Sequence, residues 1–325
     1  MTTPGSANAD MGTFHYGVLP GQSVGGRTRV RAYQEQHVDE PLPKGTAFTF
    51  IKRLLSLNDI AEPHDPLIEV IVLSKNDPDT GLRVMRSIQH HRLPITRAIF
   101  TQGQSPYSYI PALNMSLFLS ANGADVRDAV ERGFPGGQVL HWSATEDPAA
   151  DDDERDLRIA FDFDGVLAGD EAEQVMQQRG LEDFHQHESM NANTPHAPGP
   201  LQPFLAGINK IQKREEERRQ QDPSYRIRVR VSVVTARNAP SHERAVASLK
   251  AWGVTVNDAF FLGGLDKGPI LGVLRPHIFF DDQERHVRLT SKATPSVHVP
   301  FGVINHQKRS GTGSVVLGGD HVRSP

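Results

Sequence analysis

Two aspartates separated by a single residue end an apolar segment near the middle of the chain. Asp162 and Asp164 close the run at 158–166, and Gly165 lets the backbone turn sharply after them. Alternate residues of a strand project to the same side, so both carboxylates start out facing one site. Because carboxylates so close together repel each other unless a cation or a shared proton offsets their charge, the pair predicts a hard metal ion such as Mg²⁺. A turn or a helix cap is the ordinary alternative for Asp-x-Asp at a strand end.

Further polar side chains stand at the ends of two later strand-like segments and at one helix start. Thr235 ends one such segment, and Asp281 and Asp282 end another. Lys267 lies just before Pro269, which suits the first turn of a helix. Ligands of open α/β sheets bind outside the carboxyl ends of the strands, so we expect these groups to converge with the first two aspartates. Singly they could be a cap, a turn and a solvated charge; their order along the chain favours one shared site.

These groups carry a resemblance to a known family. The order Asp162-x-Asp164, Thr235, Lys267, Asp281-Asp282 resembles the four motifs of haloacid-dehalogenase-like phosphatases. A wider set of segments resembles the cytosolic type I 5′-nucleotidases: Val-Val-Thr-Ala-Arg (233–237), Phe-Phe-Leu-Gly-Gly (260–264), Lys-Gly-Pro (267–269), Arg-Pro-His-Ile-Phe-Phe-Asp-Asp-Gln (275–283), 87–103, 187–188 and 199–201. The similarity runs from about residue 33 to about residue 303, most of the chain.

The resemblance implies a role for each catalytic residue. Asp162 corresponds to the nucleophile, which would form an aspartyl-phosphate and split one hard displacement into two easier ones. Asp164 would protonate the departing ribose 5′ oxygen and then deprotonate the water that hydrolyses the intermediate. Thr235 and Lys267 would bind the phosphoryl oxygens. The implied reaction is the hydrolysis of nucleoside monophosphates, AMP first among them, to nucleoside and phosphate.

The resemblance also implies the metal ligands. Mg²⁺ would be held by Asp162, the backbone carbonyl of Asp164 and a carboxylate of Asp281 or Asp282. The residues alone do not choose between the last two.

Alternating strand-like and helical segments predict an α/β fold with a parallel sheet. The strand-like segments lie at 68–73, 98–100, 117–119, 157–163, 229–234, 259–262 and 277–280, and a helix is expected at 81–91. The resemblance refines this to a haloacid-dehalogenase-like Rossmannoid sheet with an inserted cap, preceded by a degenerate Rossmannoid repeat. About seventy residues separate the second aspartate from the motif threonine, more than a tight crossover needs, so the cap is expected at about 168–226.

The expected domains follow from composition. Polar, glycine-rich ends predict disordered tails at 1–26 and 306–325, and an acidic run predicts a linker at 145–156. The degenerate repeat is then expected at 27–144 and the catalytic domain at 157–305.

An internal repeat supports this division. Residues 70–121 align without gaps on 231–282, an offset of 161 residues. Pro106 stands where the second copy has its motif lysine, and Ser120-Ala121 where it has the paired aspartates, so the first copy is expected to be inactive. Shared buried positions of any two βαβ segments are the alternative explanation.

Substrate specificity is expected in the cap. We interpret 185–199 as a polar loop in which His187, Glu188 and Asn191 read the nucleotide, although such residues more often cap or turn the backbone. Arg237, directly after the motif threonine, is a candidate for the phosphate or sugar.

Composition bounds the partners. The 325 residues carry 35 basic and 39 acidic side chains, a formal charge of −4, which disfavours a nucleic-acid polymer and favours a small molecule. Cysteine is absent, and no apolar run or secretion pattern points to a membrane, so we expect a cytoplasmic enzyme. Base rates favour a homo-oligomer, and the resemblance hints at an effector nucleotide. The alternative functions are a phosphatase of the same scaffold acting on sugar phosphates, or a catalytically silent nucleotide-binding regulator.

Overall fold

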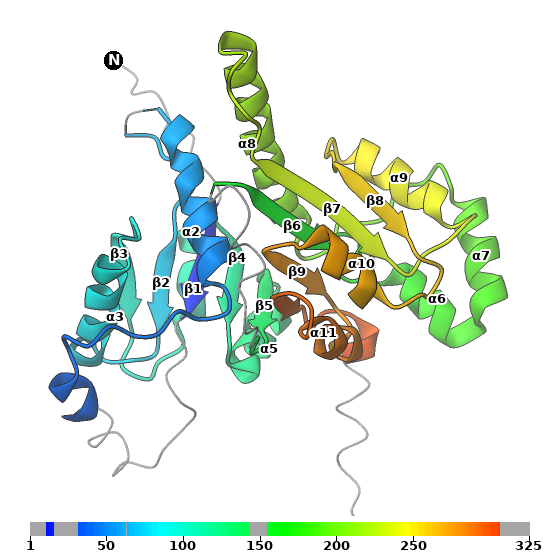
Figure 1. Cartoon of the computed structure of the whole chain (residues 1–325). Coiled ribbons are helices and arrows are strands. Elements are labelled where there is room, and N and C mark those ends of the chain that lie inside the picture. The colour runs from blue at the N-terminus through cyan, green and yellow to red at the C-terminus, as the bar shows by residue number, and fades with distance from the viewer. Residues whose placement is uncertain (1–10, 16–31, 63, 143–154, 306–325) are drawn as a thin grey trace, which may run out of the picture.

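The computed structural model describes residues 11–15, 32–62, 64–142 and 155–305, which form a mixed α/β fold around one sheet (Figure 1). The strands are β1 (Met11–His15), β2 (Ile71–Ser74), β3 (Arg97–Phe100), β4 (Met115–Ser120), β5 (Gly136–Val139), β6 (Leu157–Phe161), β7 (Val229–Thr235), β8 (Asp258–Phe261), β9 (Ile278–Asp281) and β10 (Ser296–His298). Their order across the sheet is β3-β2-β1-β4-β5-β10-β9-β6-β7-β8. Among these described strands all neighbours are parallel except β5 and β10, which pair antiparallel. The predicted α/β fold with a parallel-dominated sheet is confirmed.

The two halves of the sheet have the same strand order. From the outer edge inward, the first half reads β3-β2-β1-β4-β5 and the second β8-β7-β6-β9-β10. The registers correspond as well, because Val72 pairs with Ala98 in the first half and Val233 with Ala259 in the second. Each residue of the second pair lies 161 positions after its counterpart, the offset seen in the sequence.

Helices cover the sheet between the strands. They are α2 (Phe48–Ser56), α3 (Pro78–His90), α4 (Tyr109–Ala112), α5 (Gly123–Glu131), α6 (Glu171–Arg179), α7 (Leu181–Met190), α8 (Gln202–Gln221), α9 (His242–Ala251), α10 (Lys267–Leu274) and α11 (Glu284–Thr290), with short 3₁₀ helices η1 (Leu57–Ile60) and η2 (Pro106–Ser108). Helix α3 shows how the sequence begins one: the Asp77 carboxylate accepts from the Thr80 N–H at 2.8 Å, and Pro78 occupies the first turn.

One hydrophobic core runs through both halves. It joins Leu54 of α2 and Leu117 of β4 to Phe161 of β6, Phe204 of α8 and Val297 of β10, all of them buried. Strands covered on both faces read as nearly continuous apolar runs, as β7 does. The halves therefore share this core, and each half also has a smaller buried cluster of its own, around Phe118 in the first and Phe279 in the second.

An ion pair between buried Arg228 and exposed Asp59 adds to this contact between the halves. Arg228, just before β7, donates to the Asp59 carboxylate of η1, with Nη1 to Oδ2 at 3.0 Å. Its own backbone N–H donates to Glu215 of α8 at 2.9 Å, and Glu215 also accepts from Tyr225 and from the Val229 N–H. Glu215 is fully buried, so its charge depends on these donors.

Three helices, α6 to α8, lie between β6 and β7 in the chain, within the segment where an insertion was expected. In Figure 1, α6 and α7 lie beyond the arrowheads of β7 and β8, while α8 stands at the opposite end of β7. The insertion thus reaches both ends of the strands in this half of the sheet.

The sequence missed three strands. β5 and β10 were not predicted, and β1 lies within 1–26, where a tail without a strand was expected. All three are short, from three to five residues, and β1 and β5 contain glycine. Their partners on both sides supply the pairing that local propensity does not. Most of the expected linker and the tail at 306–325 lie outside the described residues.

Among the described helices, none is both long and apolar enough to cross a membrane.

Acid stability should depend on His277, a buried imidazole before β9. Its Nδ1 accepts from the Arg158 N–H at 2.9 Å, and burial together with the charges of Arg53, Arg158 and Arg275 lowers the pKa of His277 to about 2. As pH falls below about 6.5 the unfolded chain binds a proton there and the folded chain does not, so stability falls with it, by about 2 kcal/mol between about pH 7 and pH 5. His277→Asn keeps an acceptor and removes the titration.

Chemical unfolding of both proteins at the two pH values measures this. His277→Asn should lose less stability on acidification than the parent, whereas His90→Asn, which removes an exposed imidazole, should behave as the parent. An identical acid dependence in His277→Asn would contradict the assignment.

Candidate functional site

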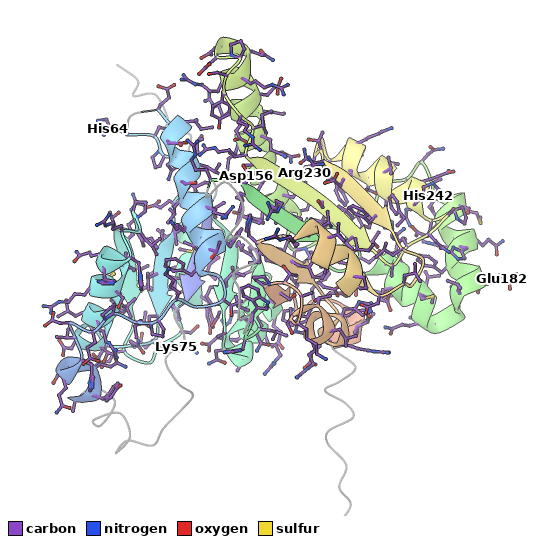
Figure 2. All side chains as sticks on the ribbon, viewed as in Figure 1. His64, Lys75, Asp156, Glu182, Arg230 and His242 are labelled. Atoms are coloured by element: carbon purple, nitrogen blue, oxygen red, sulfur yellow. The ribbon has the colours of Figure 1, made fainter. Side chains whose placement is uncertain are left out.

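The predicted catalytic residues gather at the carboxyl edge of three adjacent strands, β9, β6 and β7. Asp162 follows β6, Thr235 ends β7, Asp281 ends β9, and Lys267 opens α10. In Figure 2, Arg230 lies near the start of β7 and His242 beyond its other end, where the site forms. All four side chains are buried.

A lysine bridges two of the aspartates. Lys267 Nζ lies 2.8 Å from Asp162 Oδ2 and 2.6 Å from Asp281 Oδ2. Burial disfavours the ammonium, but the two carboxylates hold the pKa of Lys267 above its usual range. Burial would also raise the pKa of Asp281, yet Lys267 and His286 lower it to about 2. The lysine is therefore charged and fixed between two strand ends.

Negative charge remains in excess around this lysine. One carboxylate oxygen from each of Asp162, Asp281 and Asp282 lies within 4.8 Å of the others. Burial raises the pKa of Asp162 to about 6 despite Lys267, and burial with the neighbouring aspartates raises the pKa of Asp282 well above its usual range. Three carboxylates and one ammonium fit a hard divalent cation, which would supply the missing positive charge.

The two paired aspartates differ in how their oxygens are used. Asp281 Oδ1 accepts from the Gln283 N–H at 2.8 Å, and its Oδ2 accepts from Lys267. Asp282 Oδ1 is buried and has no hydrogen-bond partner among the described residues. An unpaired buried carboxylate oxygen is costly without a ligand, so this atom is the best placed to bind a cation.

Gly165 allows the Asp282 carboxylate to lie close to the backbone that follows Asp164. Its φ of 69° lies in the left-handed region that glycine tolerates, and a Cβ there would meet the Asp282 carboxylate. The glycine was expected only to turn the chain; it also makes room for the carboxylate of Asp282.

Asp164 faces a different partner. Its carboxylate receives two hydrogen bonds from Arg237, Nε to Oδ2 and Nη2 to Oδ1, both at 2.7 Å. Arg237 is 3% exposed, and although burial opposes it, the charges of Asp164 and Glu188 hold the pKa of Arg237 above its usual range. The guanidinium binds protein carboxylates here, which differs from the expected contact with phosphate or sugar.

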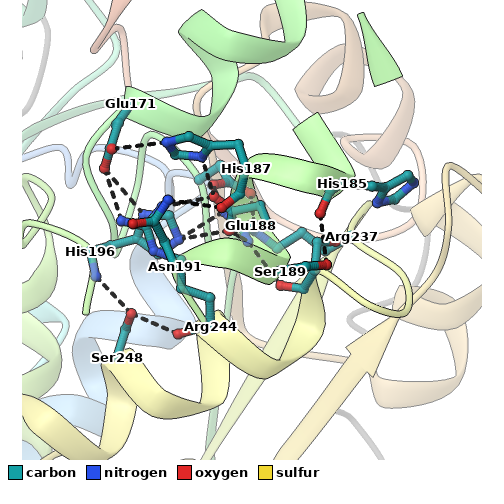
Figure 3. Close-up of polar contacts among 12 residues, drawn as sticks. Glu171, His185, His187, Glu188, Ser189, Asn191, His196, Arg237, Arg244 and Ser248 are labelled. Atoms are coloured by element: carbon teal, nitrogen blue, oxygen red, sulfur yellow. Dashed lines mark hydrogen bonds and ion pairs between the residues drawn. The ribbon is translucent and has the colours of Figure 1, made fainter. Parts of the chain in front are cut away.

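Glu188 of α7 is the centre of a buried polar cluster (Figure 3). Oε1 accepts from Arg244 of α9 at 2.8 Å, and Oε2 lies 3.1 Å from His196 Nε2 and accepts from Arg237. Burial would raise the pKa of Glu188, but the hydrogen bond from His196 and the charge of Arg237 hold it well below its usual range. The carboxylate is ionised and fully enclosed.

Comparison with known proteins bears on this arrangement. The model of the 5′-nucleotidase family matches residues 23–306. The chain belongs to the 5′-nucleotidase family. It is 32% identical over 267 residues to human cytosolic 5′-nucleotidase 1B, covering 81% of this chain and 43% of that relative, so the chain spans less than half of the relative's length. No solved structure matches the chain.

This 5′-nucleotidase-family chain places the expected specificity residues differently. His187 and Glu188 belong to α7, so the expected loop at 185–199 begins as helix. His187 Nδ1 lies 3.3 Å from Glu188 Oε1, and Asn191 donates to the His187 carbonyl at 2.9 Å. All three are engaged in contacts within the protein; His187 and Asn191 remain partly exposed and Glu188 does not.

Sequence reasoning missed two members of the cluster, His196 and Arg244. His196 was part of the expected polar loop, and Arg244 lies on α9, outside every motif. Arg244 follows Arg237 by seven residues, but the chain between them is a loop before α9 begins at His242, so the spacing by itself predicted no contact.

Gly165→Ala is expected to lower the free energy of unfolding more than Gly253→Ala. Both glycines have left-handed φ values, 69° and 65°, where a Cβ costs about 1–2 kcal/mol. Only at Gly165 would the Cβ also collide with Asp282, because nothing lies within 4 Å at Gly253. Urea unfolding of the two variants measures the difference. Equal losses would show that Asp282 does not need this glycine.

Proposed function

We propose that this chain is a magnesium-dependent 5′-nucleotidase that hydrolyses nucleoside monophosphates through an aspartyl-phosphate on Asp162. The observation that carries the proposal is Lys267 between Asp162 and Asp281, with Asp282 beside them, at one strand edge of a 5′-nucleotidase-family chain. The name of the human relative supports the nucleotide and a cytoplasmic location. An effector nucleotide and a homo-oligomer stay predictions.

In the first step Asp162 attacks phosphorus as the bond to the ribose 5′ oxygen breaks. Its backbone is fixed, since the Asp162 N–H donates to the Phe280 carbonyl at 2.7 Å and Oδ1 accepts from the Phe163 N–H at 2.7 Å. Lys267 holds Oδ2 and stands ready to share its other N–H donors with a phosphoryl oxygen. A fixed nucleophile gains from proximity rather than from intrinsic reactivity.

Asp164 gives its proton to the departing 5′ oxygen and recovers a proton from the water that hydrolyses the aspartyl-phosphate. Thr235 lies beside this path, 1% exposed, with its Oγ1 accepting from the Arg237 N–H at 3.3 Å. Because this oxygen accepts from a backbone N–H, the hydroxyl proton of Thr235 is free to be donated to a phosphoryl oxygen, which is the role proposed for it.

Mg²⁺ would be held by Asp162, Asp282 and the backbone carbonyl of Asp164, with Asp281 turned to Lys267. When bound, the ion offsets phosphate charge that would otherwise repel the nucleophile. The unpartnered Oδ1 of Asp282 supports this choice over Asp281.

We further propose that the fold is haloacid-dehalogenase-like, with α6 to α8 as its cap and the first half as a degenerate copy. The matching strand orders and the 161-residue register offset support duplication. The β1 register supports loss of activity in the first copy. Phe14 pairs with Val72 as Phe161 pairs with Val233, so the position that corresponds to Asp162 is occupied by His15.

Phosphate release tests the activity. The parent should turn over nucleoside monophosphates with Mg²⁺ and lose turnover in EDTA, and Asp162→Asn should reduce kcat by a factor of about 10³ or more, since the nucleophile is removed. A panel of nucleotides and sugar phosphates gives the substrate class. Preference for sugar phosphates would discard the nucleotide, and nucleotide binding without turnover would favour the silent regulator.

Thermal unfolding with and without Mg²⁺ tests the ligand assignment. Saturation at about a hundred times Kd should stabilise the parent by about 3 kcal/mol. Asp282→Asn should lose this increment and be at least as stable as the parent without Mg²⁺, because one repelling carboxylate is gone. Asp281→Asn should be less stable without Mg²⁺, because Lys267 loses a partner. The reverse pattern would make Asp281 the ligand.

A further inference from the structure

A continuous chain of charged contacts runs from the proposed acid–base residue into the inserted helices. Asp164 binds Arg237, Arg237 binds Glu188 of α7, and Glu188 binds Arg244 of α9. Figure 3 shows the part of this path from Arg237 to Arg244. Arg244 continues to Glu171 of α6 at 3.1 Å, where the chain of contacts reaches solvent. The path thus links the carboxyl edge of the sheet to both α6 and α7.

Arg237 is held on every side. Its Nη1 also donates to the Ser241 carbonyl at 3.0 Å. The guanidinium carbon lies 5.1 Å from the ring centre of Phe163 and 5.5 Å from that of Phe184, which is also on α7. A planar group so enclosed has one orientation, and it transmits that orientation to the carboxylate it binds.

Asp164 nevertheless keeps the capacity for proton transfer. A carboxylate has about four lone-pair positions, and the fork of Arg237 takes one on each oxygen. The remaining positions can bind a proton, so the pair fixes the angle of the carboxylate without blocking its chemistry.

Helix α7 is placed by the same contacts. Phe184 and Glu188 are one turn apart on its buried face, while Glu182 is exposed and points away from the body (Figure 2). Helix α7 has few buried apolar side chains, so the buried carboxylate of Glu188 is a main link between this helix and the sheet.

We propose that Arg237 and Glu188 are positioning residues that set the carboxylate of Asp164 for proton transfer, so that leaving-group protonation depends on the docking of α7. The proposal rests on the proposed function of Asp164. In the step concerned, the Asp162–phosphorus bond forms, the bond from phosphorus to the 5′ oxygen breaks, and the proton moves from Asp164 to that oxygen.

The test compares two substrates that differ in one atom. A nucleoside 5′-monophosphate has an alkoxide leaving group that needs the proton, whereas its 5′-S-phosphorothiolate analogue, with sulfur as the bridging atom, departs as a stable thiolate. Loss of a general acid lowers rates by a factor of about 10²–10⁴. We expect Glu188→Gln and Arg237→Lys to lose at least about tenfold more kcat/KM on the oxygen ester than on the sulfur ester. The value of kcat/KM is used because it covers only the steps through leaving-group departure.

Glu215→Gln is the matched control. Glu215 is also a fully buried carboxylate near an arginine, with Oε1 3.6 Å from Arg228 Nε, but it lies at the opposite end of β7. Its substitution should destabilise the chain and affect both substrates equally. If Glu188→Gln does not fold, Glu188→Asp and Arg237→Lys carry the same comparison, with folding checked by thermal unfolding.

Asp164→Asn separates the two levels of the argument. Selective loss on the oxygen ester in Asp164→Asn, with equal losses on both esters in Glu188→Gln and Arg237→Lys, would overturn the positioning role and leave the proposed function standing. Equal losses in Asp164→Asn itself would overturn the acid role and the inference with it. Selective losses in all three variants, with a double Glu188→Gln, Arg237→Lys variant no worse than the poorer single one, support a single path.

Discussion

A buried ammonium between two buried carboxylates is the constraint on which the site depends. Lys267 touches Asp162 at the end of β6 and Asp281 at the end of β9, two strands that are neighbours in the sheet. A buried charge left without its partner costs about 3–5 kcal/mol. The start of α10 is therefore tied to both strand ends, and any shift of one element by a few ångströms would leave a charge unpaired. The same requirement that stabilises the fold keeps Asp162, the proposed nucleophile, in place.

The charges form two zones with different balances. In the inner zone, three carboxylates surround one ammonium, and burial together with the neighbouring carboxylates raises the pKa values of Asp162 and Asp282. In the outer zone, Asp164, Glu188 and Glu171 share two guanidiniums, Arg237 and Arg244, so each of these carboxylates has an arginine partner. The proposed divalent cation would therefore bind in the inner zone. The outer zone can act as a rigid support because its carboxylates and guanidiniums are already paired with one another.

Local signals explain what the sequence could predict. Asp162, Thr235 and Asp281 stand directly at strand ends, so a strand pattern followed by a polar residue was enough to bring them together. Glu188 could not be assigned in the same way, because its partner Arg237 is 49 residues away and the loop expected around it is partly helix. The strands β1 and β10 were not predicted for a related reason. Their few residues form strands because distant parts of the chain supply pairing partners, not because of their own sequence pattern.

One antiparallel pair among the described strands decides what the first half can contribute to the site. Strands within each half are parallel, and β5 and β10 pair antiparallel, so the two halves run in opposite directions. The carboxyl ends of β2 and β4 therefore point in the opposite direction from the carboxyl ends of β6, β7 and β9. Loops that follow β2 and β4 therefore cannot line the site formed by Asp162, Thr235 and Asp281 in the same chain. The first half instead provides a partner for β10, which would otherwise be an exposed edge strand next to the strand that carries Asp281. It also contributes side chains to the shared hydrophobic core.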